Sequence, residues 1–465
     1  MQAGPPYRAL RTPAPWAHRP CPTVAPGVRS FLLREATVPH TARSPTLSPD
    51  LRAGLLRHFG HATFRPGQEP LARALLGGRD AIGLLPTGGG KSVTYLLPAA
   101  LGSDLTLVVS PLVSLMADQV RRAREAGLPA GALHAGVPPA ERADLITRAR
   151  SGDLRVLLLA PERLTSPSIE PLLRSGRVKR VAIDEAHCLI QWGFDFRPAY
   201  LNVAGIGQRL GCPVLAVTAT ATPSVREAIE RVLGLEDPVR VVGSFDRPNL
   251  RWCVRRVRRE GDRWTRLRQA LDGAGAALVY APTRRSVEAL RHALAARGIG
   301  AEAYHAGLGA GERARVQERF LGGGVRVVVA TNAFGMGVDK SDVRRVIHWA
   351  PPASVEAWYQ EAGRAGRDGR PAECLLLWAP DDLCLHARMA ARSSRDRSRA
   401  DLAPDSRDPR VVARWREASR RRLRAMSRFV RGRGCRRHAV LTYLGENDPP
   451  RRCAACDRCC RATSL

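Results

Sequence analysis

Short apolar runs alternate with amphipathic stretches along most of the chain. From about residue 48 onward the runs are four to six residues long, and apolar residues recur at helical spacing between them. Continuous apolar runs of this length are typical of strands buried on both faces of a parallel sheet. The alternation of strand and helix predicts an α/β fold with parallel sheets flanked by helices. The predicted strands form two sets, which are Leu105–Val109, Val156–Ala160, Val178–Ile183 and Val214–Val217, then Ala276–Tyr280, Val325–Ala330, Val346–Trp349 and Cys374–Trp378.

An internal repeat relates the two sets. His134-Ala135-Gly136 recurs as His305-Ala306-Gly307, and matches at the same offset of 171 residues extend to Arg155-Val156 and Arg326-Val327. We interpret the repeat as a duplicated α/β domain and place its copies at residues 48–243 and 244–385. Two such domains leave a cleft between them, which is a common place for a ligand.

The two ends of the chain differ in composition from its middle. Residues 1–47 hold nine prolines, six arginines and one acidic residue, which predicts a disordered leader; a transit peptide and a misassigned start are the alternatives. Residues 386–410 are polar and rich in arginine, and they predict a linker or a solvated helix. Residues 411–465 combine a helical pattern with a cysteine cluster and predict a small helical module.

Hydropathy and cysteine usage narrow the class of protein. No run of 18 or more apolar residues is present, so we expect a soluble, cytoplasmic protein, associated with the nucleoid if the source is bacterial. Six of the eleven cysteines are scattered and five crowd the C-terminus. That distribution indicates a reduced compartment and one metal site, not a disulfide framework.

A glycine-rich loop is the first candidate for chemistry. Leu85-Pro86-Thr87-Gly88-Gly89-Gly90-Lys91-Ser92 follows the apolar segment Ala81–Leu84 and opens an apolar helix pattern. In this context glycines let backbone N–H groups close around phosphate oxygens at a helix N-terminus. Leu85 stands where the strict pattern has glycine, so this is a variant loop. Lys91 is one of three lysines in the chain, and we expect it to reach the β- and γ-phosphates of ATP; an unliganded turn is the alternative.

Paired carboxylates follow a predicted strand. Asp184-Glu185-Ala186-His187 comes directly after Val178–Ile183, at the carboxyl end of a parallel strand. We expect Asp184 to hold Mg²⁺ together with Ser92, and Glu185 to orient and deprotonate the attacking water. Taken alone, an Asp-Glu pair is also common on protein surfaces.

Two arginines lie in the second predicted domain, within the run from Gln360 to Gly369. Arg364 and Arg367 are three residues apart, which puts them on one face if the run is helical. From there they could reach the γ-phosphate across the cleft as arginine fingers.

These residues together resemble a superfamily II helicase, and the RecQ family of DNA helicases most closely, over about residues 50 to 460. The resemblance implies that Arg65 and Gln68 contact the adenine and that Arg367 is the arginine finger, with Arg364 beside it. It assigns the coupling of hydrolysis to movement to His187, Thr218 and Thr220. It also implies that the stretch Ala330–Lys340, which includes Asp339, contacts both DNA and nucleotide.

The stretch Gln191–Tyr200 resembles the aromatic-rich loop by which RecQ helicases couple DNA sensing to hydrolysis. Trp192 and Phe196 could stack on unpaired bases, and Arg197 could meet a phosphate or link to the ATP site. A buried aromatic turn is the alternative. Two positions depart from the family: His61 stands where an aromatic residue often stacks on adenine, and Phe194 replaces a histidine of some relatives.

The cysteine cluster predicts a metal site. Its four candidate ligands are Cys435, Cys453, Cys456 and Cys459, whose spacing suits a structural zinc ion. An iron–sulfur cluster is the alternative from spacing alone, and Cys460 could replace Cys459. The resemblance to the RecQ zinc-binding module favours zinc.

The resemblance implies an ATP-, Mg²⁺- and Zn²⁺-dependent DNA helicase, moving 3′→5′ on single-stranded DNA and acting in DNA repair and recombination. We expect a monomer that binds single-stranded and tailed or forked duplex DNA. The chain ends just after the zinc module, without the winged helix that engages duplex DNA in relatives, so translocation with weak unwinding is an alternative. An RNA helicase of the Asp-Glu-Ala-His type and a catalytically idle nucleic-acid-binding protein are the others.

Charge adds a candidate DNA surface. The chain carries a net charge of +31, with 71 arginines, an excess that either a polyanionic partner or a GC-biased genome would produce. Residues 391–465 contribute +13 of that total. Because the excess is concentrated there, we expect the zinc module and its flanking helix to act as an electrostatic clamp on DNA, weakened steeply by salt.

Overall fold

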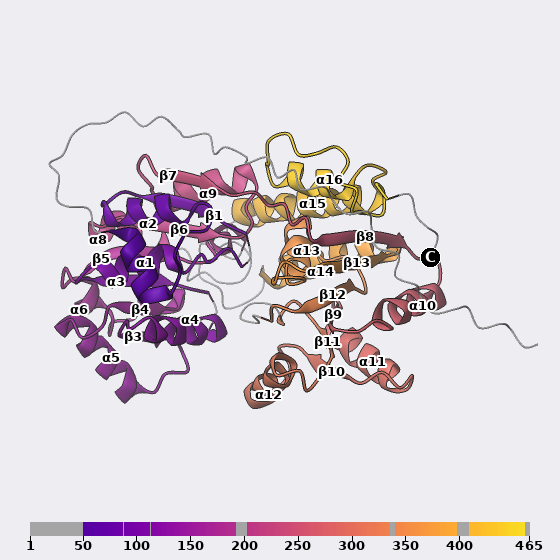
Figure 1. Cartoon of the computed structure of the whole chain (residues 1–465), viewed down its shortest axis with the longest axis horizontal. Helices are drawn as coiled ribbons and strands as arrows, with labels where there is room; N and C mark the ends of the chain where they lie inside the picture. Colours follow the sequence, from indigo (N-terminus) through magenta and orange to yellow (C-terminus); the bar gives the residue numbers. More distant parts are fainter. Residues whose placement is uncertain are drawn as a thin grey trace, which may run out of the picture. The chain divides into compact units, whose positions relative to one another are not determined.

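The structure is a computed structural model that describes residues 50–460, except residues 87, 112, 192–201, 335–339 and 398–408. The leader predicted for residues 1–47 lies outside this range. In the described part the chain forms two parallel sheets flanked by helices, followed by a helical C-terminal region with the cysteine cluster (Figure 1). This is the fold class expected from the sequence.

The first sheet has seven strands in the order β3-β4-β2-β5-β6-β1-β7, and its paired strands run parallel. We call this part of the chain the first lobe. Its strands are β1 (Ala81–Leu84), β2 (Leu105–Val109), β3 (Ala130–Leu133), β4 (Val156–Leu159), β5 (Val178–Ile183), β6 (Val214–Thr218) and β7 (Val239–Val242). Its helices are α1 (Leu51–Phe59), α2 (Gln68–Leu76), α3 (Val93–Leu101), α4 (Val113–Glu125), α5 (Pro139–Ser151), the 3₁₀ turn η1 (Pro161–Arg163), α6 (Glu170–Leu173), α7 (Cys188–Gln191), α8 (Ile206–Leu210) and α9 (Pro223–Leu233).

The second sheet has six parallel strands in the order β10-β11-β9-β12-β13-β8, and it forms the second lobe. Its strands are β8 (Leu250–Arg256), β9 (Ala276–Tyr280), β10 (Ala301–Tyr304), β11 (Val327–Ala330), β12 (Val343–His348) and β13 (Ala372–Trp378). Its helices are α10 (Glu260–Leu271), α11 (Arg284–Ala295), α12 (Ala310–Leu321) and α13 (Val355–Ala362). The C-terminal helices are α14 (Pro380–Arg397), α15 (Pro409–Arg431) and α16 (Arg436–Tyr443).

The internal repeat corresponds to matched elements of the two lobes. Strands β2, β3 and β4 begin 171 residues before β9, β10 and β11, and helix α5 begins 171 residues before α12. Each set occupies the same end of its sheet, in the orders β3-β4-β2 and β10-β11-β9. The repeat in the sequence is therefore a repeat of structure.

The C-terminal region packs on the second sheet through aromatic side chains. Trp252 of β8 lies edge-on to Trp358 of α13, with ring centroids 5.1 Å apart, and Trp358 contacts Phe429 of α15 at 4.8 Å. Such pairs contribute about 0.5–1.5 kcal/mol each beyond burial. At the sheet edge, Trp252 accepts a hydrogen bond from the Asp457 N–H and donates one to the Ala455 carbonyl, so the cysteine-bearing loop covers β8.

The stretch predicted as a linker or a solvated helix is helical up to Arg397, where α14 ends. Residues 398–408 lie outside the described part of the chain. Within that part, no helix combines the length and the hydropathy that a membrane span requires.

Candidate functional site

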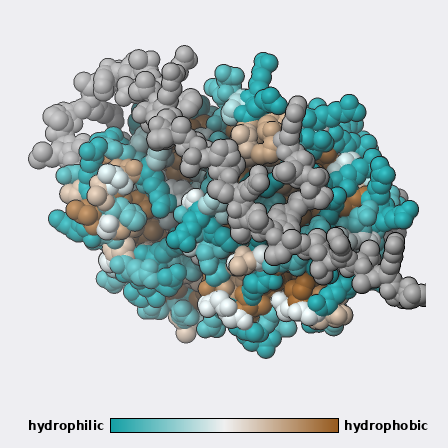
Figure 2. All heavy atoms as spheres, turned by 45° about the vertical axis from the view of Figure 1, so that its right-hand side comes forward, coloured by the Kyte–Doolittle hydropathy of each residue, from teal (hydrophilic) through white to brown (hydrophobic). Residues whose placement is uncertain are grey.

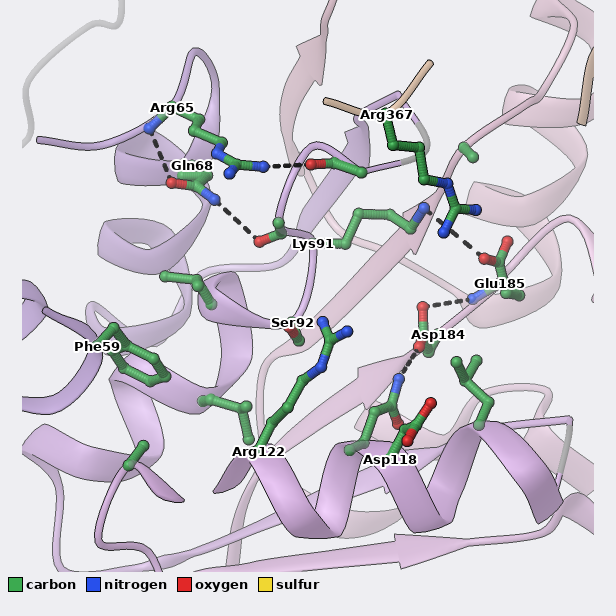
Figure 3. A pocket seen from close by; sticks show the side chains of 18 of the residues that line it. Phe59, Arg65, Gln68, Lys91, Ser92, Asp118, Arg122, Asp184, Glu185 and Arg367 are labelled. Carbon is green, nitrogen blue, oxygen red and sulfur yellow. Dashed lines mark hydrogen bonds and ion pairs between the residues drawn. The ribbon is translucent and has the colours of Figure 1, made fainter. Parts of the chain in front are cut away.

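A cavity of about 720 Å³ lies between the two lobes. The first lobe contributes residues of the glycine-rich loop and the carboxylates after β5, and the second lobe contributes Gln360, Arg364 and Arg367. Figure 3 shows the labelled side chains of this cavity pointing toward one another from different elements. Among the described residues, the structure therefore places Arg65, Gln68, Lys91, Ser92, Asp184, Glu185, Arg364 and Arg367 around one cavity.

The glycine-rich loop has a conformation that requires glycine. Gly88 and Gly90 have φ angles of +80° and +71°, in the left-handed region. A Cβ atom on Gly90 would lie 2.4 Å from Nε2 of Gln68. The loop leads into α3, whose N-terminal N–H groups provide the setting for an anion.

Gln68 and Arg65 hold this loop by its carbonyl groups. The Gln68 side chain is 3% exposed, and its Nε2 donates to the carbonyls of Gly89 and Gly90 at 3.1 and 2.9 Å. Its Oε1 accepts the Arg65 N–H at 2.8 Å, and the Arg65 guanidinium donates to the Gly88 carbonyl. Both residues line the cavity; their contact with adenine stays a prediction.

The two carboxylates lie beside Lys91 at the end of β5. Lys91 Nζ is 3.7 Å from Oε1 of Glu185, and Asp184 Oδ2 accepts a hydrogen bond from the Gln119 amide. Burial and the neighbouring Glu185 raise the pKa of Asp184 to about 6. Burial also acts to raise the pKa of Glu185, but Lys91 and His187 outweigh it and lower that pKa to about 2. Glu185 is thus a carboxylate at neutral pH.

Asp184 and Ser92 fit a hard divalent cation. Both line the cavity, and Figure 3 shows Ser92 on the side of the loop that faces Asp184. Carboxylate and hydroxyl oxygens are the donors that Mg²⁺ prefers, and a nearby cation would favour the charged form of Asp184.

Arg364 and Arg367 approach this group from the second lobe, in the turn after α13. Arg364 is buried and its charge contributes to lowering the pKa of Glu185. Figure 3 shows the Arg367 side chain beside Lys91 and Glu185. Both predicted arginines therefore lie at the cavity opposite the phosphate loop.

His187, Thr218 and Thr220 form one hydrogen-bonded group. His187 Nδ1 lies 2.8 Å from Thr218 Oγ1 and 3.3 Å from a carboxylate oxygen of Glu185. Gln360 Nε2, from the second lobe, lies 3.2 Å from His187 Nε2 and donates to Thr220 Oγ1 at 2.5 Å. The three predicted coupling residues thus connect the Glu185 carboxylate of the first lobe to Gln360 of the second lobe.

Several residues at the cavity were missed as site residues. Gln119 and Arg122 are three residues apart on α4, so they share a face, but no motif marks them in the sequence. Gln360 opens the run that carries Arg364 and Arg367, but nothing in that run distinguishes it as a site residue. Phe59 also lines the cavity, near His61, so an aromatic ring is present although His61 departs from the family pattern.

Some predicted site residues lie outside the described residues. They are Thr87 of the glycine-rich loop, Trp192, Phe196 and Arg197 of the aromatic-rich loop, and Asp339.

The predicted metal ligands come together in the C-terminal region. The sulfur atoms of Cys435, Cys453, Cys456 and Cys459 all lie within 4.8 Å of one another, and those of Cys435 and Cys456 are 3.9 Å apart. Tetrahedral zinc with bonds of about 2.3 Å holds its sulfur ligands about 3.8 Å apart, so the four thiols fit this ion. The Cys460 thiol instead donates to the Ala454 carbonyl.

The electrostatics of the cluster suit a thiolate. The Cys453 thiol and backbone N–H groups, among them that of Arg436, donate to Cys456 and hold its pKa at about 4, against the effect of burial. Arg436 also pairs with Asp457 at 3.1 Å, and both side chains are 2% exposed. This buried ion pair ties α16 to the cysteine-bearing loop.

Three families of known proteins match successive parts of the chain. DEAD/DEAH box helicases match residues 65–228, the helicase conserved C-terminal domain matches residues 262–369, and the RecQ zinc-binding family matches residues 387–460. Among solved structures, the Mycobacterium smegmatis helicase Lhr, bound to ssDNA and AMP-PNP, has a similar fold. Its TM-score is 0.59 at 24% identity, covering 82% of this chain and 57% of that one.

Curated relatives extend the match. The ATP-dependent DNA helicase RecQ of Pasteurella multocida is 38% identical over 403 residues, which cover 86% of this chain and 61% of the relative. RecQ of Synechocystis sp. is 35% identical over 467 aligned positions, covering 88% of this chain and 98% of the relative. The chain spans less than two thirds of the relatives from Pasteurella multocida and Haemophilus influenzae. The match to nearly the whole Synechocystis protein, with the zinc-binding family at the C-terminal end, shows that this chain belongs to the RecQ family of helicases.

Proposed function

We propose that the chain is an ATP-driven motor that moves 3′→5′ along single-stranded DNA and separates paired strands, in DNA repair and recombination. The observation that carries this proposal is the single cavity lined by the phosphate loop and carboxylates of one lobe and the arginines of the other. Relatives named ATP-dependent DNA helicase RecQ support it. We expect the protein to act as a monomer in the cytoplasm.

The residues of the cavity have separate roles in ATP hydrolysis. Lys91 and the N–H groups at the start of α3 bind the phosphates, and Ser92 and Asp184 would hold Mg²⁺, which would neutralise charge on the β- and γ-phosphates. Glu185, a carboxylate at neutral pH, orients the attacking water and accepts its proton. Arg364 and Arg367 stabilise the charge that develops as the γ-phosphate leaves.

Movement follows from the position of the site between the lobes. A nucleotide held by both lobes favours their closed arrangement, and hydrolysis removes that preference, because a ligand shifts an equilibrium only through its differential affinity for the two states. The group of His187, Thr218, Thr220 and Gln360 crosses this boundary next to Glu185, so it is suited to couple closure to hydrolysis.

We propose that α15 supplies the DNA clamp. Its buried side includes Val412, Trp415, Met426 and Phe429, while Glu417 is its single acidic residue. Among the coloured residues in Figure 2, hydrophilic ones predominate. The exposed arginines of α15 are Arg416, Arg420, Arg421, Arg424, Arg428 and Arg431. Cations at helical spacing along one exposed side suit the phosphates of a DNA strand.

The four clustered cysteines would hold a structural zinc ion that fixes α16 and the cysteine-bearing loop against β8. Zinc contributes the folding free energy of such small modules. The resulting fold would place α15 where its arginines stay exposed.

Steady-state ATP hydrolysis by the purified chain, with and without single-stranded DNA, tests the proposed activity. We expect Mg²⁺-dependent hydrolysis that rises with DNA and is abolished in Lys91→Ala. Equal stimulation by RNA would favour an RNA helicase, and turnover unchanged in Lys91→Ala would contradict the assigned site.

A further inference from the structure

The linker between the lobes, residues 243–249, contacts the turn that carries the two arginines. The Arg247 guanidinium donates to the Gly363 carbonyl at 3.2 Å and to the carbonyls of Ala365 and Gly366, both at 3.0 Å. These three acceptors lie on both sides of Arg364 in the sequence. One linker side chain thus holds the backbone around Arg364 and just before Arg367.

Asn249 adds a second anchor from the same linker. Its Nδ2 donates to the carbonyls of Gly366 and Arg370 at 2.8 and 2.9 Å. Gly366 has a φ of +54°, and a Cβ atom there would lie 2.5 Å from this nitrogen. The turn therefore approaches the linker too closely for any residue but glycine.

The C-terminal region holds the linker from its other side. Glu446 accepts hydrogen bonds from the Ser244 hydroxyl at 2.7 Å and from the Phe245 N–H at 3.2 Å. Arg437 pairs with Asp246 and donates to the Leu250 carbonyl at 2.8 Å. Because Arg437 follows Cys435 by two residues, these contacts connect the cysteine module to the linker.

Arg247 has no direct route to a bound nucleotide in this arrangement, because it is not among the described residues that line the cavity. Its guanidinium hydrogen bonds to the carbonyls at the C-terminal end of α13, where a cation is favoured by the helix dipole. Any effect of Arg247 on hydrolysis must then pass through the turn that it holds.

We propose that Arg247 is a positioning residue for ATP hydrolysis. It sets the turn so that Arg364 and Arg367 reach the γ-phosphate across the cleft, and Glu446 and Arg437 fix the linker that bears it. The inference rests on the proposed function, because it presupposes hydrolysis in this cavity. It goes beyond that function by assigning a role to the linker and to its contacts with the cysteine module.

The test compares DNA-stimulated ATP hydrolysis by the full chain and by Arg247→Ala. A displacement of about 1 Å in a positioned group can cost about 100-fold in rate, so we expect kcat to fall by roughly 10- to 100-fold. The KM for ATP should change by less than about threefold, since Lys91 and Gln68 are untouched. Arg247→Lys should recover part of the loss, because one ammonium group cannot reproduce the fork that reaches three carbonyls.

A second comparison separates positioning from general destabilisation. If Arg247 acts only through the turn, adding Arg247→Ala to Arg364→Ala/Arg367→Ala should lower kcat little further, because residues that act as a unit are not additive. Arg258→Ala, an exposed arginine just beyond β8, is the matched control and should behave as the unchanged chain. Thermal unfolding and zinc content check that each variant is folded.

Two results would overturn the proposal. One is an Arg247→Ala variant whose kcat equals that of the unchanged chain. The other is a combined variant whose loss in kcat equals the product of the losses caused by Arg247→Ala and by Arg364→Ala/Arg367→Ala. If Arg247→Ala does not fold, the same comparisons are made with Arg247→Lys, whose unaltered kcat would equally contradict it. Failure of the proposed function itself would look different, because the unchanged chain would then show no DNA-stimulated hydrolysis.

Discussion

Gln360 Nε2 of the second lobe lies 3.2 Å from His187 Nε2 of the first lobe, immediately behind the carboxylates of the cavity. The same Gln360 nitrogen donates to Thr220 Oγ1, while His187 Nδ1 faces Thr218 and Glu185. The contact therefore links the separation of the lobes to the side chain that orients Glu185.

Gln360→Ala should uncouple the lobes without emptying the nucleotide site. We expect DNA stimulation of ATP hydrolysis to fall by about tenfold, which corresponds to a coupling free energy of about 1.4 kcal/mol. Affinity for ATP should stay within about threefold, since the phosphate loop is unchanged. The measurement is kcat at saturating ATP with and without single-stranded DNA; equal stimulation in the variant would refute the coupling role.

Glu185→Gln should leave ATP binding intact and slow hydrolysis. The amide keeps the shape of the side chain but loses the charge that orients the attacking water, and such groups contribute about 10²- to 10⁴-fold. Single-turnover hydrolysis and binding of a fluorescent ATP analogue separate the two steps. Glu227→Gln, on the exposed side of α9, is the matched control. If Glu185→Gln lowered the affinity for the ATP analogue by the same factor as the rate of hydrolysis, Glu185 would have a structural role in the site and not a catalytic one.

Gly90→Ala should weaken nucleotide binding through the loop conformation. The new Cβ would clash with the Gln68 amide, and a left-handed φ costs a non-glycine residue roughly 1–2 kcal/mol. We expect about 5- to 30-fold weaker binding of an ATP analogue, measured by titration. Gly311→Ala, in α12 with open space around its Cβ, should bind normally and be slightly stabilised. Normal binding by Gly90→Ala would mean that the loop tolerates another conformation.

Cys456→Ser should release the metal ion and unfold the C-terminal module. Loss of a structural zinc removes on the order of 10 kcal/mol of folding free energy at neutral pH. We expect elemental analysis to show one zinc per chain before the substitution and none after it, with a lower Tm. Cys460→Ser should keep its zinc, because that thiol points to the Ala454 carbonyl. Zinc lost from Cys460→Ser would mean that the ligand set is wrong.

Replacing Arg420, Arg424 and Arg428 of α15 with glutamine should weaken DNA binding in a salt-dependent way. Each lost phosphate contact on a single strand should reduce the slope of log K against log salt by about 0.7. Fluorescence anisotropy over a salt series measures this slope. The matched control replaces three exposed arginines of the first lobe, Arg52, Arg150 and Arg174. An equal change of slope in the two triple variants would contradict a specific role of α15 in DNA binding.

The sequence predicts eight of the nine interior strands of the two sheets and none of the edge strands. β2, β4, β5 and β6, and later β9, β11, β12 and β13, are flanked by strands on both sides, and this burial favours mainly apolar sequences. Five strands are not in the predicted sets: β3, β7, β8 and β10, which are the edges of their sheets, and β1, whose segment Ala81–Leu84 is given only as an apolar run before the glycine-rich loop. β7 alternates half-buried and exposed residues, and β8 carries arginines, so neither resembles a buried strand in sequence.

The candidate site was predictable where one short segment contains both the reactive side chains and the strand or helix that positions them. The loop around Lys91 and the pair Asp184-Glu185 meet that condition. Contacts between distant segments do not: Gln119 and Asp184 are 65 residues apart, and Ser244 and Glu446 are 202 apart. Such pairs depend on how strands and helices pack, and no local pattern records them.

The central claim, ATP-driven movement in one direction along a single strand, is tested most directly by displacement of streptavidin from end-labelled oligonucleotides. A motor moving 3′→5′ runs toward the 5′ end. We therefore expect ATP-dependent displacement from a 5′-biotin label, little from a 3′-biotin label, and none with Lys91→Ala. Equal displacement from both ends, or displacement that does not require ATP, would contradict the account.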